Sequence, residues 1–63
     1  MAPEVDDTWQ QLQALSADRR AAIVLRFYED LAVSDIAAVM DKPIGTVKSL
    51  IHRGMAELKA NLA

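Results

Sequence analysis

The sequence predicts an all-α domain of four helices, the last two of which form a helix-turn-helix. Apolar residues recur at helical spacing, and no segment alternates with the two-residue period of a strand. An apolar fraction of 52% is enough for a packed core in a chain of 63 residues. The tripeptide Asp41-Lys42-Pro43 separates two helical segments by the short turn that a helix-turn-helix requires. We therefore expect residues 1–63 to form one domain.

The first helix is expected to run from about Trp9 to Leu15. The run Thr8-Trp9-Gln10-Gln11 has the form of a capping box, which marks the start of a helix. Residues 1–8 carry a proline and three acidic side chains, and we expect them to be a flexible lead-in.

A second helix is expected to follow directly and to end at about Tyr28 or Glu29. Ser16 can cap its N-terminus, and Asp18 falls in its first turn, where the helix dipole favours a carboxylate. A helix that is apolar around most of its circumference is buried on more than one side. Five residues predict such a central position here: Ile23, Val24, Leu25, Phe27 and Tyr28.

The third and fourth helices are predicted over Val33–Met40 and from Ile44 to about Asn61. The third has one apolar face at helical spacing, made of Val33, Ile36, Ala37 and Met40. Pro43 disfavours helical geometry at Lys42 and so ends the third helix. The helix-turn-helix is therefore expected to occupy about residues 33–60.

The last helix divides into two faces. The apolar face carries Val47, Ile51, Gly54, Met55, Leu58 and Leu62, and the other carries Lys48, Ser49, His52, Arg53, Ala56 and Lys59. This second face is either a plain solvated surface or a DNA-binding surface. The preceding turn and the small residues at the start of the helix favour DNA, because a recognition helix enters the major groove by its N-terminal end.

Charge is distributed unevenly along the chain, although its net value is only −2. Residues 1–41 carry eight acidic and three basic side chains, for a net charge of −5. Residues 42–63 carry four basic side chains and one acidic, for a net charge of +3. The positive end therefore coincides with the candidate recognition helix. The acidic remainder predicts weak non-specific affinity for DNA.

Several classes of protein are disfavoured by the composition. The chain has no cysteine and one histidine, so we expect neither a disulfide framework nor a metal site, and no cofactor. Glu29 and Asp30 flank no basic partner suited to catalysis, and we expect no enzyme activity. There is no apolar run of about 18 residues and no signal-peptide pattern. We therefore expect a soluble, cytoplasmic protein without membrane insertion.

Four segments, in this order, resemble region 4 of bacterial sigma factors, most closely the extracytoplasmic-function (ECF) group: Leu15–Arg20, Val24–Leu31, Asp35–Ala37 and Pro43–Ser49. The resemblance covers about residues 9–60. It implies a helix-turn-helix of sigma region 4 type (winged-helix-like) whose second helix binds the minus-35 promoter element. It also implies docking on the flap of the RNA polymerase β subunit, and an anti-sigma factor as a further partner.

The resemblance implies DNA-binding roles for six residues: Lys42, Thr46, Lys48, Ser49, His52 and Arg53. Lys42 and Thr46 are expected near phosphates, and the other four are expected to face the DNA. Arginine binds the N7 and O6 atoms of guanine in a bidentate manner, which is the role expected for Arg53. A sigma factor also needs a region that melts the minus-10 element, so we expect this chain to be excised from a longer protein.

Three positions depart from the pattern of the family. Leu50 stands where an arginine is usual, Asp41 replaces the turn glycine, and Ala32 replaces a capping serine or threonine. Leu50 either lies in a protein interface or packs on the turn at Pro43 and Ile44.

Two other interpretations remain at this point. A LuxR-type response-regulator output domain also has a Thr-Val-Lys recognition helix, but it usually has a histidine at the position of Leu50. Alternatively, the chain acts mainly as a protein-interaction module, for example toward an anti-sigma factor. Its contact patch would then be Val39, Leu50 and Met55.

Overall fold

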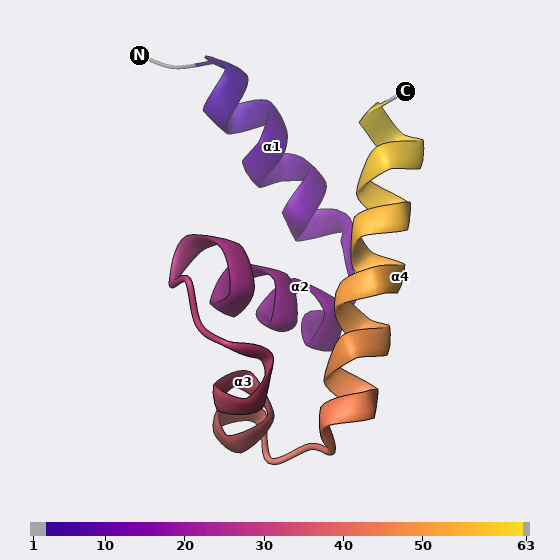
Figure 1. The fold of residues 1–63 in the computed structure, drawn as a ribbon. Coiled ribbons are helices and arrows are strands. Elements are labelled where there is room, and N and C mark those ends of the chain that lie inside the picture. The colour runs from indigo at the N-terminus through magenta and orange to yellow at the C-terminus, as the bar shows by residue number, and fades with distance from the viewer. Residues whose placement is uncertain (1–2, 63) are drawn as a thin grey trace.

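The computed structural model describes residues 3–62, which form four α-helices and one π-helical turn (Figure 1). The elements are α1 (Pro3–Ala14), α2 (Ala17–Ile23), η1 (Val24–Tyr28), α3 (Val33–Met40) and α4 (Ile44–Leu62). The described residues contain no strand, which confirms the all-α prediction. Helix α4 runs the length of the molecule, with α1 beside its C-terminal half, α2 across its middle and α3 against its N-terminal end.

The predicted start of the first helix at Trp9 is wrong. Helix α1 already begins at Pro3 and ends at Ala14, while Met1 and Ala2 lie outside the described residues. Proline is favourable at the first position of a helix, where its missing N–H costs no hydrogen bond. The capping-box pattern at Thr8 therefore falls inside a helix that has already started.

Helix α2 begins as predicted, with Ser16 as its cap. The Ser16 hydroxyl oxygen accepts a hydrogen bond of 3.4 Å from the backbone N–H of Arg19, and Asp18 lies in the first turn. The helix ends at Ile23, however, and the chain continues through the π-helical turn η1. The wider turn is closed by a hydrogen bond of 3.1 Å from the N–H of Glu29 to the carbonyl oxygen of Val24.

The π-helical turn corrects the expected burial of this segment. Ile23 is buried, and Leu25 packs against the core, but Phe27 and Tyr28 are each 55% exposed. A turn with i→i+5 hydrogen bonds holds more residues than an α-helical turn, so it rotates the side chains that follow it around the axis. The second helix is therefore central in its first half only.

The turn between α3 and α4 explains how an aspartate replaces the expected glycine. Helix α3 spans the predicted residues, and Asp41 then adopts the left-handed conformation, with φ 55° and ψ 49°. The N–H groups of Asp41 and Lys42 donate to the carbonyl oxygens of Ala38 and Ala37, at 3.3 and 3.0 Å. This is the Schellman pattern, and aspartate is among the residues that tolerate left-handed geometry best.

The other departure in this motif carries a cost. Ala32 occupies the cap position of α3 in extended geometry, and it makes no side-chain hydrogen bond to the helix. A serine or threonine there would satisfy one free backbone N–H group. Its absence costs about 1 kcal/mol of stability.

Two small cores lie along α4. One is formed by Leu12, Leu15, Ile23 and Leu58, with Met55 packed against it. The other is formed by Ile36, Ala37 and Val47, with Leu25, Leu31, Val33, Met40 and Ile51 packed against it. All four residues of the predicted apolar face of α3 thus pack into the second core, which fixes the start of α4 against α3.

Helix α2 crosses α4 at Gly54. This glycine is buried, and a Cβ atom added to it would overlap Cδ1 of Ile23 and lie 3.2 Å from Cγ1 of the same side chain. Gly54 therefore permits the close approach that sets the position of α4 on α2.

Candidate nucleic-acid interface

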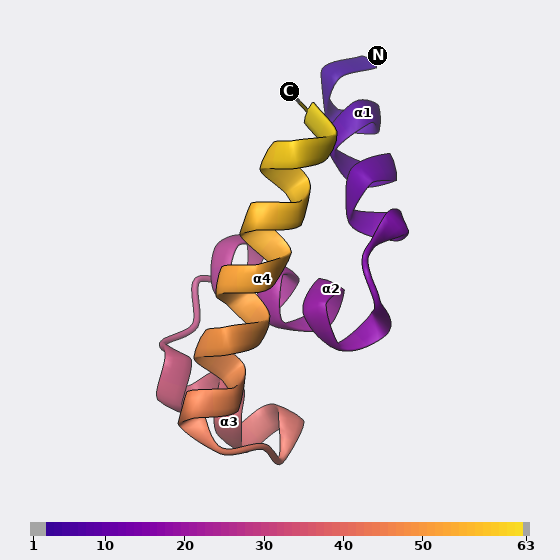
Figure 2. The ribbon, with the colours of Figure 1, turned by 90° about the vertical axis from the view of Figure 1, so that its right-hand side faces the viewer.

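The polar face of α4 is exposed as predicted. Val47, Gly54 and Leu58 are buried beneath the helix. Figure 2 shows that no other described helix lies in front of α4, so its outer face is uncovered. Every predicted DNA-binding residue on this helix is exposed: Thr46, Lys48, Ser49, His52 and Arg53. The polar side chains in the first half of α4 are thus accessible from outside the described part of the protein.

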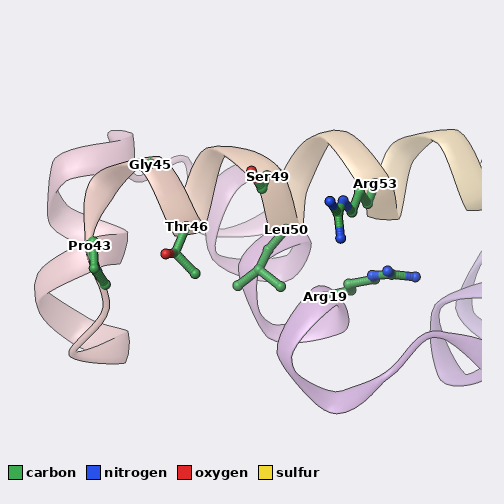
Figure 3. Close-up of a pocket in the computed structure, with 7 residues that line it drawn as sticks. All are labelled: Arg19, Pro43, Gly45, Thr46, Ser49, Leu50 and Arg53. Carbon is green, nitrogen blue, oxygen red and sulfur yellow. The ribbon is translucent and has the colours of Figure 1, made fainter.

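A hollow lies where the start of α4 faces α2. Its lining is made of Arg19, Pro43, Gly45, Thr46, Ser49, Leu50 and Arg53 (Figure 3). The side chains of Thr46, Leu50 and Arg53 point from α4 toward the side on which α2 lies. The hollow is lined by two hydroxyl side chains and by the guanidinium group of Arg53, which are donors suited to an anionic ligand such as a phosphate, whereas the guanidinium group of Arg19 is paired with Glu57.

Two ion pairs join α2 to the helix-turn-helix. Nη1 of Arg19 lies 2.9 Å from Oε1 of Glu57 on α4, and Nζ of Lys42 lies 3.5 Å from Oδ2 of Asp18. Lys42 is therefore engaged within the protein, and only 32% of its side chain is exposed. To contact a phosphate, Lys42 would have to exchange this partner.

The three residues considered as a protein-contact patch do not gather in one place. Val39 is 64% exposed on α3, whereas Met55 packs against the core around Leu12. Leu50 is half-buried and lines the hollow beside Ser49 and Arg53. Residues five apart on a helix, such as Leu50 and Met55, point in directions that differ by roughly 140°. Leu50 and Met55 therefore do not share a face of α4, and Val39 lies on a different helix.

Sequence reasoning missed Arg19 as a residue near this surface. Its position in the chain identified only the start of a helix, because Ser16 and Asp18 are its neighbours. Contact with α4 depends on the close crossing at Gly54, where a Cβ atom would lie 3.6 Å from Cβ of Arg19. No local sequence pattern signals the contact between Arg19 and Glu57, which are 38 positions apart.

Each helix of residues 3–62 is too short or too polar to cross a bilayer.

Comparison with known proteins identifies a family for most of the chain. The model of the family described as "Sigma-70, region 4" matches residues 6–58. The RNA polymerase sigma-H factor of Pseudomonas aeruginosa is 50% identical over 44 residues, which cover 70% of this chain and 23% of that protein.

Two further relatives cover more of the chain. The ECF RNA polymerase sigma factor SigW of Bacillus subtilis is 37% identical over 60 residues (94% of this chain, 32% of that protein). The RNA polymerase sigma-E factor of Streptomyces avermitilis is 34% identical over 68 residues, which cover 92% of this chain and 38% of that protein. The chain thus spans between 23% and 38% of the length of these relatives.

Proposed function

Because the chain belongs to the sigma-70 region 4 family, we propose that it binds the minus-35 element of promoters through the exposed face of α4. The observation that carries this proposal is the uncovered first half of α4, where basic and hydroxyl side chains stand on a helix fixed by two buried cores. A helix presented in this way fits the major groove. The family match favours neither a LuxR-type domain nor a module limited to protein contacts.

Each exposed side chain has a role in this proposal. Arg53 reads a guanine in the major groove, and Lys48 binds a phosphate or a base. Ser49 and His52 lie between them on the same face and contact base edges. Thr46, in the first turn of α4, contacts a phosphate. Lys42 contacts a phosphate too when its ion pair with Asp18 opens.

We further propose two protein partners for the whole protein, namely the flap of the RNA polymerase β subunit and an anti-sigma factor. The relatives are named as RNA polymerase sigma factors, which supports the polymerase as a partner. Exposed apolar side chains such as Val39, Phe27 and Tyr28 support protein contacts in general. Since bacterial promoters and polymerase are cytoplasmic, we propose the same location for this chain.

The proposal predicts weak and salt-dependent binding of DNA by this chain alone. Lys48 and Arg53, joined by Lys42 where it leaves Asp18, would neutralise about two or three phosphates. The logarithm of the binding constant should therefore fall with a slope of about −2 to −3 against the logarithm of the salt concentration. Fluorescence anisotropy of a labelled duplex over a salt series measures this slope. Nanomolar affinity at ~0.15 M salt would contradict the proposal.

The same titration distinguishes the two hypotheses for Leu50. If Leu50 lies in a protein interface beside the DNA face instead of packing on the turn at Pro43 and Ile44, Leu50→Arg adds a phosphate contact, so it should tighten DNA binding and steepen the slope by about 0.9. Leu50→Gln, which is polar but uncharged, is the matched control and should leave the slope unchanged. A Leu50→Arg variant that melts several degrees lower and keeps the parent slope would show that Leu50 is part of the core.

A further inference from the structure

Glu57 is the one acidic residue of the basic C-terminal segment, residues 42–63. It lies four residues after Arg53 on α4, and side chains at this spacing are neighbours on a helix surface. An unpartnered carboxylate there would have two effects. It would repel the phosphates of an approaching duplex, and it would compete with DNA for the guanidinium group of Arg53.

The structure pairs Glu57 with a different arginine. Nη1 of Arg19 donates a hydrogen bond of 2.9 Å to Oε1 of Glu57, and both side chains are about one-third exposed (34% and 35%). Figure 3 shows the Arg19 side chain extending along α4 toward the C-terminal half of that helix, whereas the Arg53 side chain turns toward the hollow. None of the ion pairs among the described side chains involves Arg53.

We propose that Arg19 is a positioning residue for DNA binding: it holds and neutralises Glu57, and so leaves Arg53 unpaired on the DNA face. This inference rests on the proposed function. A purely structural ion pair is the simpler alternative, but exposed pairs of this kind contribute little to stability. Direct contact between Arg19 and a phosphate is the other alternative. In that case, removing the charge of Glu57 should not restore the DNA binding that is lost with Arg19.

A double-mutant cycle separates these possibilities. The probe is a fluorescein-labelled duplex of random sequence, titrated at ~0.05 M salt, where electrostatic contacts dominate binding. Arg19→Ala should weaken binding about fivefold, because it exposes the carboxylate and lets it pair with Arg53. Glu57→Gln alone should bind at least as tightly as the parent chain. Adding Glu57→Gln to Arg19→Ala should restore binding to within about twofold of the parent.

Two matched variants control for charge and for folding. Arg20→Ala removes the same charge from the neighbouring position, but Arg20 donates to the carbonyl oxygen of Gln13 and takes part in none of the ion pairs among the described side chains, so it should have the smaller effect. Arg19→Lys keeps a cation beside Glu57 and should bind like the parent. If Arg19→Ala lowers the melting temperature, Arg19→Gln replaces it in the cycle, since glutamine keeps the stem that packs beside Gly54.

Three results would overturn the inference. Binding that stays weak in the double variant would mean that Arg19 contacts phosphate directly. Equal losses for Arg19→Ala and Arg20→Ala would reduce the effect to net charge. If Arg19→Ala binds like the parent while Lys48→Ala binds more weakly, the role of Arg19 is refuted and the proposed DNA face is kept. If both variants bind like the parent, the proposed DNA face itself is refuted.

Discussion

Replacing Gly54 with alanine should lower the free energy of unfolding by about 1–3 kcal/mol. At most exposed helix positions this change is stabilising by about 1 kcal/mol, because alanine has the higher helix propensity. At Gly54 the added Cβ atom overlaps Ile23, a β-branched side chain that is only 2% exposed and whose rotamers are restricted. Urea denaturation followed by circular dichroism at the helical signal measures the loss.

Two variants make this prediction specific to the crossing of α2 and α4. Gly45→Ala is the matched control, because nothing lies within 4 Å of a Cβ atom added there, and it should be neutral or slightly stabilising. Ile23→Val removes the overlapping Cδ1 atom. The double variant with Gly54→Ala should therefore lose less free energy of unfolding than the two single variants lose together. A Gly54→Ala variant as stable as the parent would mean that α2 and α4 do not cross this closely.

Replacing Arg53 with alanine should weaken binding to a selected promoter sequence by about 1–3 kcal/mol and relax the preference at one base pair. The reason is the loss of a bidentate contact to guanine by a side chain that is exposed and free of ion pairs among the described residues. Selection from a random pool of duplexes, followed by anisotropy titration of the enriched sequence and of its single-base variants, measures both effects.

Lys59→Ala provides the control for charge. Lys59 is exposed on the same helix and carries the same charge, but it lies about a turn and a half beyond Arg53, away from the turn of the helix-turn-helix. Its removal should cost little affinity and should leave the base preference unchanged. Equal losses for the two variants, with no change in preference, would reduce Arg53 to a non-specific electrostatic role.

The helix-turn-helix was the part of the fold most accessible to sequence reasoning. The four apolar residues of α3 share one face at helical spacing, and they all pack into one core. Pro43 marks the boundary of the turn, and Asp41 takes the left-handed geometry that the pattern of the family assigns to this position. These features are local, since each depends on residues within one or two helical turns.

The first half of the chain was predicted less well, for two physical reasons. A proline followed by acidic residues is typical of a disordered lead-in, but it is equally compatible with the first turn of a helix such as α1. The π-helical turn over Val24–Tyr28 also changes which side chains face the core, and a 3.6-residue period cannot represent it. The exposure of Phe27 and Tyr28 follows from that turn.

The candidate site was predicted on α4 but not across from it. Helical spacing alone placed Lys48, Ser49, His52 and Arg53 on one exposed face. The contact of Arg19 with Glu57 joins residues 38 positions apart, and it depends on a close helix crossing that no periodicity encodes. The assignment of the four α4 residues to DNA binding remains a proposal.

Mapping a bound duplex onto the chain tests the proposed DNA face most directly. In a titration of the isotope-labelled chain with a duplex at low salt, we expect the largest amide chemical-shift changes over residues 42–53. Small changes are expected at Trp9, Phe27 and Tyr28, which are exposed but lie on other elements. Largest changes on α1 or η1, with the first half of α4 unaffected, would contradict the assignment of α4 as the recognition helix.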